Sequence, residues 1–216
     1  DPQDLDLTDN SITENTRFAY GLGCNPMVRD GARGPVPKTI VLLTADAFGV
    51  LPPVSLLDQD EVMYHFVSGF TSKLAGTEVG VTEPKAAFSA CFGAPFMARH
   101  PSVYAELLAK KMKACNARAI LLNTGWSGGP YGIGKRISIG HTRALLDASL
   151  RGDLDSVETE RHPVFGLRMP TSCPDVPSEI LNPRNTWEDK EAYDRQAAEL
   201  RDMFHTNFAD KGLAAL

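Results

Sequence analysis

The sequence predicts a mixed α/β (α+β) fold, because strand-like and helix-like apolar patterns alternate along its 216 residues. Residues 39–43 and 119–123 are short runs rich in β-branched and apolar side chains, which is typical of buried strands. Apolar residues recur every three to four positions in four other stretches, as they do in helices that cover a core: residues 58–74, 101–115, 138–150 and 187–208. Because 43% of the residues are hydrophobic, the chain has enough apolar material for one such domain.

The first half is expected to contain one strand and one helix. Residues 39–43 have the composition of a central strand, and the proline pair at residues 52–53 excludes regular structure just beyond. A helix is expected over residues 58–74, ended by Gly76. Its apolar stripe consists of Val62, Phe66 and Phe70. Residues 76–84 contain two glycines and are expected to form a mobile loop.

The second half places a glycine-rich loop between a strand and a helix. Residues 119–123 are the predicted strand, residues 125–134 the loop, and residues 138–150 the helix, which Gly152 closes. A short strand is expected over residues 164–169. Two further helices have apolar stripes, formed by Tyr104, Leu108, Met112 and Cys115, and by Tyr193, Ala197, Leu200, Phe204 and Phe208.

The start of the chain differs from the rest in charge. Its first ten residues include four aspartates and no base, so residues 1–12 are expected to form a flexible acidic arm. Residues 13–216 are expected to form a single domain or a large piece of one. Because the chain begins without a methionine, we expect it to be a piece of a longer protein.

Composition argues against several classes of protein. The net charge of −5 disfavours nucleic-acid binding, and no apolar run is long enough to cross a membrane. The four cysteines are far apart and form no Cys-x-x-Cys pair, so neither a zinc site nor a redox motif is indicated. Reduced thiols in a cytoplasmic protein are expected, with Cys115 buried on its helix.

The glycine-rich loop partly matches a phosphate-binding loop. Residues 129–135 fit the first seven positions of Gly-x-x-x-x-Gly-Lys-Ser/Thr, between a strand and a helix. Arg136, however, stands where a hydroxyl should hold magnesium, and Pro130 removes a backbone N–H. The best carboxylate candidate, Asp46, lies upstream of the loop rather than downstream. The sequence therefore disfavours a true phosphate loop.

Two interpretations of this loop remain. It is a surface turn with solvated bases, or it belongs to a ligand site, since Lys135, Arg136 and Arg143 are close together in sequence. In the second case the planar guanidinium of Arg136 would lie on an aromatic base. A backbone carbonyl or a hydroxyl nearby would read the exocyclic amine of that base.

Several stretches, in order and without a large gap from Ser11 onwards, resemble the ATP-dependent phosphoenolpyruvate carboxykinases. They are Glu14-Asn15-Thr16-Arg17, Leu43-Thr44-Ala45-Asp46-Ala47-Phe48-Gly49-Val50-Leu51-Pro52-Pro53-Val54, Ser68-Gly69-Phe70-Thr71-Ser72-Lys73-Leu74-Ala75-Gly76-Thr77-Glu78, Thr82-Glu83-Pro84, Phe88-Ser89-Ala90-Cys91-Phe92-Gly93, Asn123-Thr124-Gly125-Trp126, Gly134-Lys135-Arg136-Ile137-Ser138-Ile139 and Asn182-Pro183-Arg184-Asn185. The number of blocks in register makes the resemblance highly specific. It implies that the chain is the C-terminal part of the family's mononucleotide-binding domain.

The resemblance also implies a reaction and its participants. Members of the family decarboxylate oxaloacetate and phosphorylate the enolate with ATP, which gives phosphoenolpyruvate, ADP and carbon dioxide. Two divalent metals, Mg²⁺ and Mn²⁺, assist by offsetting charge on the transferred phosphoryl group. Such an enzyme is expected to act in the cytoplasm, in gluconeogenesis.

Site residues carry over from matching motifs. By resemblance, Arg17 contacts the γ-phosphate and the substrate, where a permanent positive charge suits catalysis. Arg136 would stack on adenine, the Ile137 backbone would bond the base edge, and Thr142 would add a polar contact. Residues 76–84 resemble the family's active-site lid, which excludes water from the enolate.

The family's phosphate loop, metal ligands and oxaloacetate-binding residues all lie upstream of Ser11. The resemblance therefore makes the N-terminal portion of the same enzyme a required partner, and it assigns no metal ligand to this chain. Asp46 is expected to support the end of its strand instead. Two alternatives remain: a non-catalytic or partner-docking fragment of the same fold, and a kinase that uses residues 129–135 as a phosphate loop.

Overall fold

A computed structural model describes residues 9, 11, 19–73 and 81–211. The chain divides into two compact units, Asp1–Val36 with Lys73–Lys85, and Pro37–Ser72 with Ala86–Leu216. The described part of the first unit contains two 3-10 turns, η2 (Leu22–Cys24) and η3 (Asp30–Ala32). The expected acidic arm falls outside the described residues except at residues 9 and 11, so it stays a prediction.

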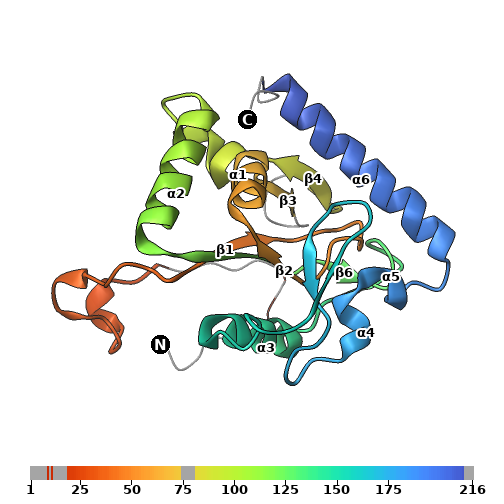
Figure 1. Cartoon of the computed structure of the whole chain (residues 1–216), viewed down its shortest axis with the longest axis horizontal. Helices are drawn as coiled ribbons and strands as arrows, with labels where there is room; N and C mark the ends of the chain where they lie inside the picture. Colours follow the sequence, from red (N-terminus) through yellow and green to blue (C-terminus); the bar gives the residue numbers. More distant parts are fainter. Residues whose placement is uncertain (1–8, 10, 12–18, 74–80, 212–216) are drawn as a thin grey trace. The chain divides into compact units, whose positions relative to one another are not determined.

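The second unit is built on a five-stranded mixed sheet, which confirms the predicted mixed α/β fold class (Figure 1). Its strands, in spatial order, are β1 (Thr39–Thr44), β5 (Arg118–Asn123), β2 (Val54–Leu57), β9 (Arg168–Pro170) and β8 (Thr159–Arg161). β1 and β5 are parallel, and the remaining pairs are antiparallel. Because Thr44 aligns with Asn123, the parallel strands end at the same sheet edge.

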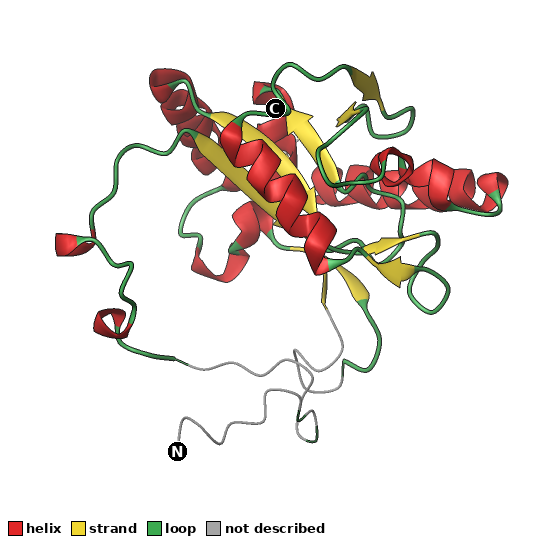
Figure 2. Ribbon diagram, turned by 90° about the horizontal axis from the view of Figure 1, so that it is seen from below, coloured by secondary structure: helices red, strands yellow, loops and turns green. Residues whose placement is uncertain are grey.

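Helices cover both faces of this sheet. The helices of the described chain are α1 (Gln59–Ser68), α2 (Pro101–Cys115), α3 (Ile139–Arg151), α4 (Ser178–Leu181), α5 (Pro183–Thr186) and α6 (Lys190–Asp210), with 3-10 turns η4 (Ala90–Phe92) and η5 (Ala94–Phe96). Leu121 packs with α1, α2 and α6, whereas its neighbours Ile120 and Leu122 pack with α3. This alternation buries β5 on both faces. Figure 2 shows α3, the helix at the bottom of Figure 1, lying across the sheet.

Two small sheets complete the fold. One pairs β3 (Phe70–Lys73) with β4 (Lys85–Phe88). The other is an antiparallel pair of β6 (Trp126–Ser127) and β7 (Lys135–Arg136), which encloses the glycine-rich loop. No helix in the described part of the chain is both long and apolar enough to span a bilayer.

Several predicted elements are confirmed. Both predicted strands form, as β1 and β5. α3 begins after the Ser138 N-cap and ends at Gly152, whose φ of 86° is left-handed. The final helix starts at Lys190, later than predicted, but buries the predicted face of Tyr193, Ala197, Leu200 and Phe204. The stripe predicted on α2 is only partly correct: Met112 is buried, but Ala105 and Ala109 are the other buried residues. Cys115, predicted as a buried thiol, is only half-buried.

Other predictions were wrong in position. β1 is not central: among the described strands it pairs with β5 alone, and Leu43 is 56% exposed. The helix predicted over residues 58–74 ends at Ser68, because Gly69 adopts a left-handed φ of 55° and caps it. Phe70, predicted on that helix, therefore lies in β3.

Three strands of the large sheet were missed or displaced. β2 follows directly after Pro53, because a proline removes only its own N–H and leaves the next residues free to pair. The strand predicted over residues 164–169 begins at Arg168, after a turn, and pairs with β8. β8 itself is short and largely exposed, so its sequence has no apolar strand pattern.

Candidate nucleotide site

The candidate site lies where the parallel strands β1 and β5 end. Asn123, the last residue of β5, accepts hydrogen bonds from the N–H groups of Asp46 (3.0 Å) and Gly125 (2.8 Å). Its side-chain amide donates to the Leu51 carbonyl at 3.0 Å. A Cβ at Gly125 would collide with the backbone of Asp46, so only glycine fits between the two loops. The carboxyl ends of neighbouring strands are a common position for ligand sites in α/β proteins.

Asp46 shapes the first of these loops. Its carboxylate is completely buried and accepts hydrogen bonds from the N–H groups of Phe48 (2.8 Å), Val50 (2.7 Å) and Leu51 (2.8 Å). Burial raises the pKa of this carboxyl group, and the N–H donors oppose that shift. Both oxygens are thus engaged by backbone, which confirms the expectation that Asp46 supports the strand end.

The described residues do not form a metal centre. They contain no group of three or more histidine, cysteine, aspartate or glutamate side chains arranged to hold an ion. Asp46 does not fit that role either, because its two carboxylate oxygens accept three backbone N–H groups. No ligand for Mg²⁺ or Mn²⁺ is therefore assigned among the described residues.

The glycine-rich loop turns its backbone N–H groups toward the protein. The Tyr131 N–H donates to the Ala47 carbonyl at 2.8 Å, and the Gly134 N–H donates to the Pro130 carbonyl at 2.8 Å. Gly128 donates to the Thr186 hydroxyl at 2.9 Å. A phosphate loop needs such groups free to meet the anion. The engaged N–H groups of Tyr131 and Gly134 therefore argue against a phosphate loop at residues 129–135.

Arg136 stands on the second strand of the hairpin, directly opposite Trp126. Its guanidinium carbon lies 4.8 Å from the indole centroid, and its Nε donates to the Thr124 carbonyl at 2.8 Å. Trp126 is 8% exposed, whereas Arg136 is exposed overall. Partial burial lowers the pKa of Arg136 from its ordinary value. One face of the guanidinium is thus held by the indole, and a planar ligand can stack on the opposite face.

Ile137 and Thr142 follow Arg136 around the start of α3. The Ile137 N–H already donates to the Gly125 carbonyl at 2.8 Å, so its carbonyl is the backbone group left for a ligand. Thr142 lies in the first turn of α3 and is half-buried. Its hydroxyl makes no hydrogen bond to another residue that the structure describes. The structure therefore places these two residues and Arg136 around one helix start.

Other predicted site residues lie outside the described residues. Arg17 is one of them, as are residues 74–80, which include most of the predicted lid; residues 81–84 are described as irregular backbone. In the sequence, Trp126 stands out only as part of a motif, and Thr186, which binds the glycine-rich loop, carries no signal of its own. Only the motif Asn182-Pro183-Arg184-Asn185, which Thr186 follows directly, pointed to that region.

Comparison with known proteins identifies the family. The chain matches the phosphoenolpyruvate carboxykinase family over residues 1–179. It belongs to that family. The resemblance predicted from the sequence motifs is thereby confirmed.

Curated relatives within the phosphoenolpyruvate carboxykinase family agree closely in sequence. The chain is 56% identical over 206 residues to the phosphoenolpyruvate carboxykinase (ATP) of Caldanaerobacter subterraneus subsp. tengcongensis, covering 95% of this chain and 40% of that protein. It is 55% identical over 206 residues to that of Flavobacterium johnsoniae, covering 95% of this chain and 39% of the relative. The chain thus spans about two fifths of these relatives and corresponds to their C-terminal part.

Proposed function

We propose that this chain is the adenine-binding part of an ATP-dependent phosphoenolpyruvate carboxykinase. The complete enzyme would convert oxaloacetate and ATP to phosphoenolpyruvate, ADP and carbon dioxide. The curated relatives named phosphoenolpyruvate carboxykinase (ATP) support this reaction. The observation that carries the role of this chain is the Arg136 guanidinium, supported on Trp126 at the end of two parallel strands.

The geometry favours adenine over guanine. A purine stacked on Arg136 would bring its edge toward Ile137, whose N–H is already bonded to Gly125. The Ile137 carbonyl would accept a hydrogen bond from the exocyclic amine of adenine. Guanine has a carbonyl oxygen at the ring position where adenine has this amine. Two facing carbonyl oxygens leave both acceptors unpaired, which a site discriminates strongly against. Thr142 would add a polar contact from the first turn of α3.

The remaining parts of the reaction are proposed from the motif matches. Arg17 would contact the γ-phosphate and the oxaloacetate-derived enolate, where its permanent charge offsets the charge of the transferred phosphoryl group. Residues 76–84 would act as the lid. Mg²⁺ and Mn²⁺ neutralise phosphate charge in such reactions, and their ligands would come from the N-terminal portion of the enzyme.

That N-terminal portion is the partner we propose for the uncovered sheet edge. Among the described strands β1 pairs on one side only, and its residue Leu43 is 56% exposed. The relatives are more than twice as long as this chain, so they have the sequence needed to cover such an edge. The proposed role in gluconeogenesis would place the enzyme in the reducing cytoplasm. The four free cysteines are compatible with that compartment.

Substitution of Arg136 tests the adenine subsite. In the complete enzyme, Arg136→Ala should raise the KM for ATP about tenfold, the loss expected for one partly desolvated stacking cation. The KM for oxaloacetate and kcat should change less than about twofold, because base stacking is similar in the ground and transition states. Steady-state kinetics with each substrate varied in turn measures all three.

The neighbouring exposed Lys135 supplies the matched control, since Lys135→Ala removes a cation from the same strand without touching the stack. It should leave the KM for ATP nearly unchanged. Equal increases in the two KM values of Arg136→Ala would show that the substitution disturbs the whole site rather than the base. A complete enzyme that forms no phosphoenolpyruvate would contradict the proposed reaction and favour a non-catalytic role.

A further inference from the structure

The hydroxyl of Thr186 is fully used where α5 meets the glycine-rich loop. It donates to the Pro183 carbonyl at 2.8 Å. With its only proton committed, its two lone pairs accept from the Gly128 N–H at 2.9 Å and the Ser127 hydroxyl at 3.1 Å. One side chain therefore joins the last turn of α5 to both residues where β6 becomes the loop.

The Thr186 contacts lie next to the residues proposed to stack on the purine, Trp126 and Arg136. Ser127 follows Trp126 in β6, and the pair faces Lys135 and Arg136 across the hairpin. Gly128 has a φ of 75°, so the chain leaves β6 in a left-handed turn that the Thr186 contact fixes. A shift of that turn would displace Trp126 relative to the guanidinium it supports.

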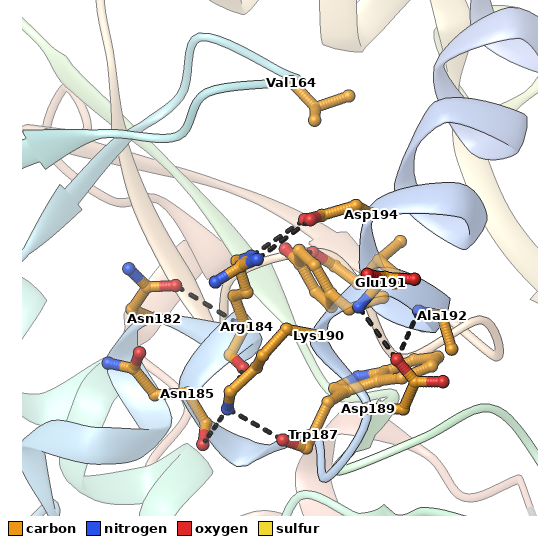
Figure 3. A network of polar contacts seen from close by, with 12 residues as sticks. Val164, Asn182, Arg184, Asn185, Trp187, Asp189, Lys190, Glu191, Ala192 and Asp194 are labelled. Carbon is orange, nitrogen blue, oxygen red and sulfur yellow. Dashed lines mark hydrogen bonds and ion pairs between the residues drawn. The ribbon is translucent and has the colours of Figure 1, made fainter.

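Lys190 holds the segment that carries Thr186 (Figure 3). Its ammonium group donates to the carbonyls of Arg184 (2.7 Å), Asn185 (3.0 Å) and Trp187 (2.7 Å), which uses all three of its protons. These carbonyls surround the C-terminal end of α5, where the last turn of a helix leaves carbonyl groups without intrahelical partners. Arg184 binds Asp194 of α6 in a bidentate pair at 2.8 and 2.9 Å.

The same segment also contacts the other loop of the site. The indole Nε1 of Trp187 donates to the Gly49 carbonyl at 2.9 Å, and Trp187 is 8% exposed. Gly49 in turn lies so close to Gly129 that a Cβ there would strike the Gly129 carbonyl. Residues 183–190 thus bind both loops that emerge from the parallel strands.

We infer that Thr186 is a positioning residue for the purine subsite, and that Lys190 keeps Thr186 in place. This inference rests on the proposed function. Neither residue would touch the nucleotide. Thr186 acts through Trp126 and Arg136, by fixing the turn at Gly128 that ends β6.

Valine and serine at position 186 separate this role from a general effect on folding. Valine has the shape of threonine without the hydroxyl, so Thr186→Val in the complete enzyme should raise both the KM and the Kd for ATP about five- to tenfold. The KM for oxaloacetate and kcat should stay within about twofold. Thr186→Ser retains the hydroxyl and should restore wild-type values.

A double-substitution cycle with Arg136→Ala gives a readout that a merely structural residue would not produce. If Thr186 acts through the stack, adding Thr186→Val to Arg136→Ala should raise the KM for ATP no further. Multiplicative effects, or equal increases in the KM for ATP and for oxaloacetate, would overturn the inference. So would a Thr186→Val enzyme with wild-type ATP kinetics.

A second variant and a binding measurement keep the test decisive. Lys190→Met, which removes the ammonium group, should weaken ATP binding in the same direction but less, about two- to fivefold. If Thr186→Val does not fold, an unchanged Kd for ATP in Lys190→Met overturns the inference. Calorimetric titration with ATP needs no turnover. A wild-type enzyme that binds ATP but forms no phosphoenolpyruvate therefore contradicts the proposed reaction alone, and one that does not bind ATP contradicts both.

Discussion

Asp46 illustrates how a single buried side chain sets the geometry of the site. An ionised carboxylate loses several kcal/mol of hydration free energy when it is buried without partners. Here three backbone N–H groups replace the lost water, and they belong to the loop that follows β1. Because the carboxylate accepts from residues two, four and five positions ahead, it bends the chain back on itself. The Asp46 carboxylate therefore sets the shape of the loop after β1, which contacts the glycine-rich loop through Ala47.

Replacing this acid should destabilise the fold measurably. In Asp46→Asn the amide group has one acceptor oxygen, so at least one buried N–H loses its partner. We expect a loss of about 2–3 kcal/mol in the free energy of unfolding, measured by urea denaturation. Asp189→Asn is the matched control, because this exposed N-cap of α6 accepts from Glu191 and Ala192, and asparagine caps helices equally well. If both variants were equally stable, the Asp46 hydrogen bonds would contribute little.

The sequence could identify Arg136 but not the residue that supports it. A planar cation after a glycine-rich loop is a recognisable pattern, and the structure places it at the predicted loop. Its contact with Trp126 depends on which residues face each other across the hairpin, and seven unpaired residues separate the two strands. Thr186 is further still, 58 positions from Gly128. Neither contact follows from local spacing.

At the scale of elements, Gly69 decides where α1 ends. Its φ of 55° and ψ of 42° are left-handed, and its N–H donates to the His65 carbonyl. The apolar spacing of Val62, Phe66 and Phe70 continues past this point, which is why the sequence predicted a longer helix. Periodicity records which side chains are apolar, but a glycine inside the pattern can turn the chain into a strand that buries the next apolar residue equally well. Phe70 is 3% exposed in β3.

Substitution of Gly69 separates backbone strain from crowding. Gly69→Ala should destabilise the fold by more than about 2 kcal/mol, because alanine disfavours this conformation and its Cβ would strike the Ser89 carbonyl. Gly166 has a similar φ of 70°, but a Cβ added there would meet no atom within 4 Å, so Gly166→Ala reports the strain alone, about 1 kcal/mol. Thermal or urea unfolding of both variants gives the comparison. Equal losses would mean that the Ser89 contact relaxes at little cost.

The apolar composition of a strand identifies β5 but not β2, which is also buried, because the proline pair before β2 predicts irregular structure there. β5 is apolar at four consecutive positions and lies between two layers of helices. β8 and β9 have three residues each and mixed exposure, so no period identifies them. β1 has the composition of a central strand although Leu43 is exposed. Its apolar character is consistent with coverage by the proposed N-terminal portion of the enzyme.

At the scale of the whole sheet-containing unit, two buried histidines join separate layers. His162 accepts from the N–H groups of Val164 and Phe165 through Nδ1, so its proton is on Nε2, which donates to the Tyr193 hydroxyl at 2.6 Å. That hydroxyl donates to the Val50 carbonyl at 2.9 Å. His65 is 6% exposed, and its ring contacts Tyr64 and Phe204. Both imidazoles are thus neutral parts of the core.

These histidines should make the fold sensitive to mild acid. Burial lowers the pKa of each from 6.5 to about 4, so between these values the unfolded chain binds protons that the folded chain does not. Their contribution to stability is complete above pH 6.5 and is lost as the pH falls toward 4. Between pH 7 and 5 we expect each to remove about 2 kcal/mol from the free energy of unfolding. Asp46, whose pKa burial raises, acts in the opposite direction.

His65→Phe isolates one of these contributions, because phenylalanine suits an aromatic surrounding and cannot be protonated. Urea denaturation at pH 7, 6 and 5 should show that the variant loses about 2 kcal/mol less than the wild type over this range. The difference between the two proteins cancels the titration of Asp46 and of His162, which both retain. Parallel stability curves would show that the folded protein protonates His65 as readily as the unfolded chain. In that case the cavity beside Tyr64 and Phe204 would have to admit enough water to solvate an imidazolium, and the core would be less closed there than its 6% exposure indicates.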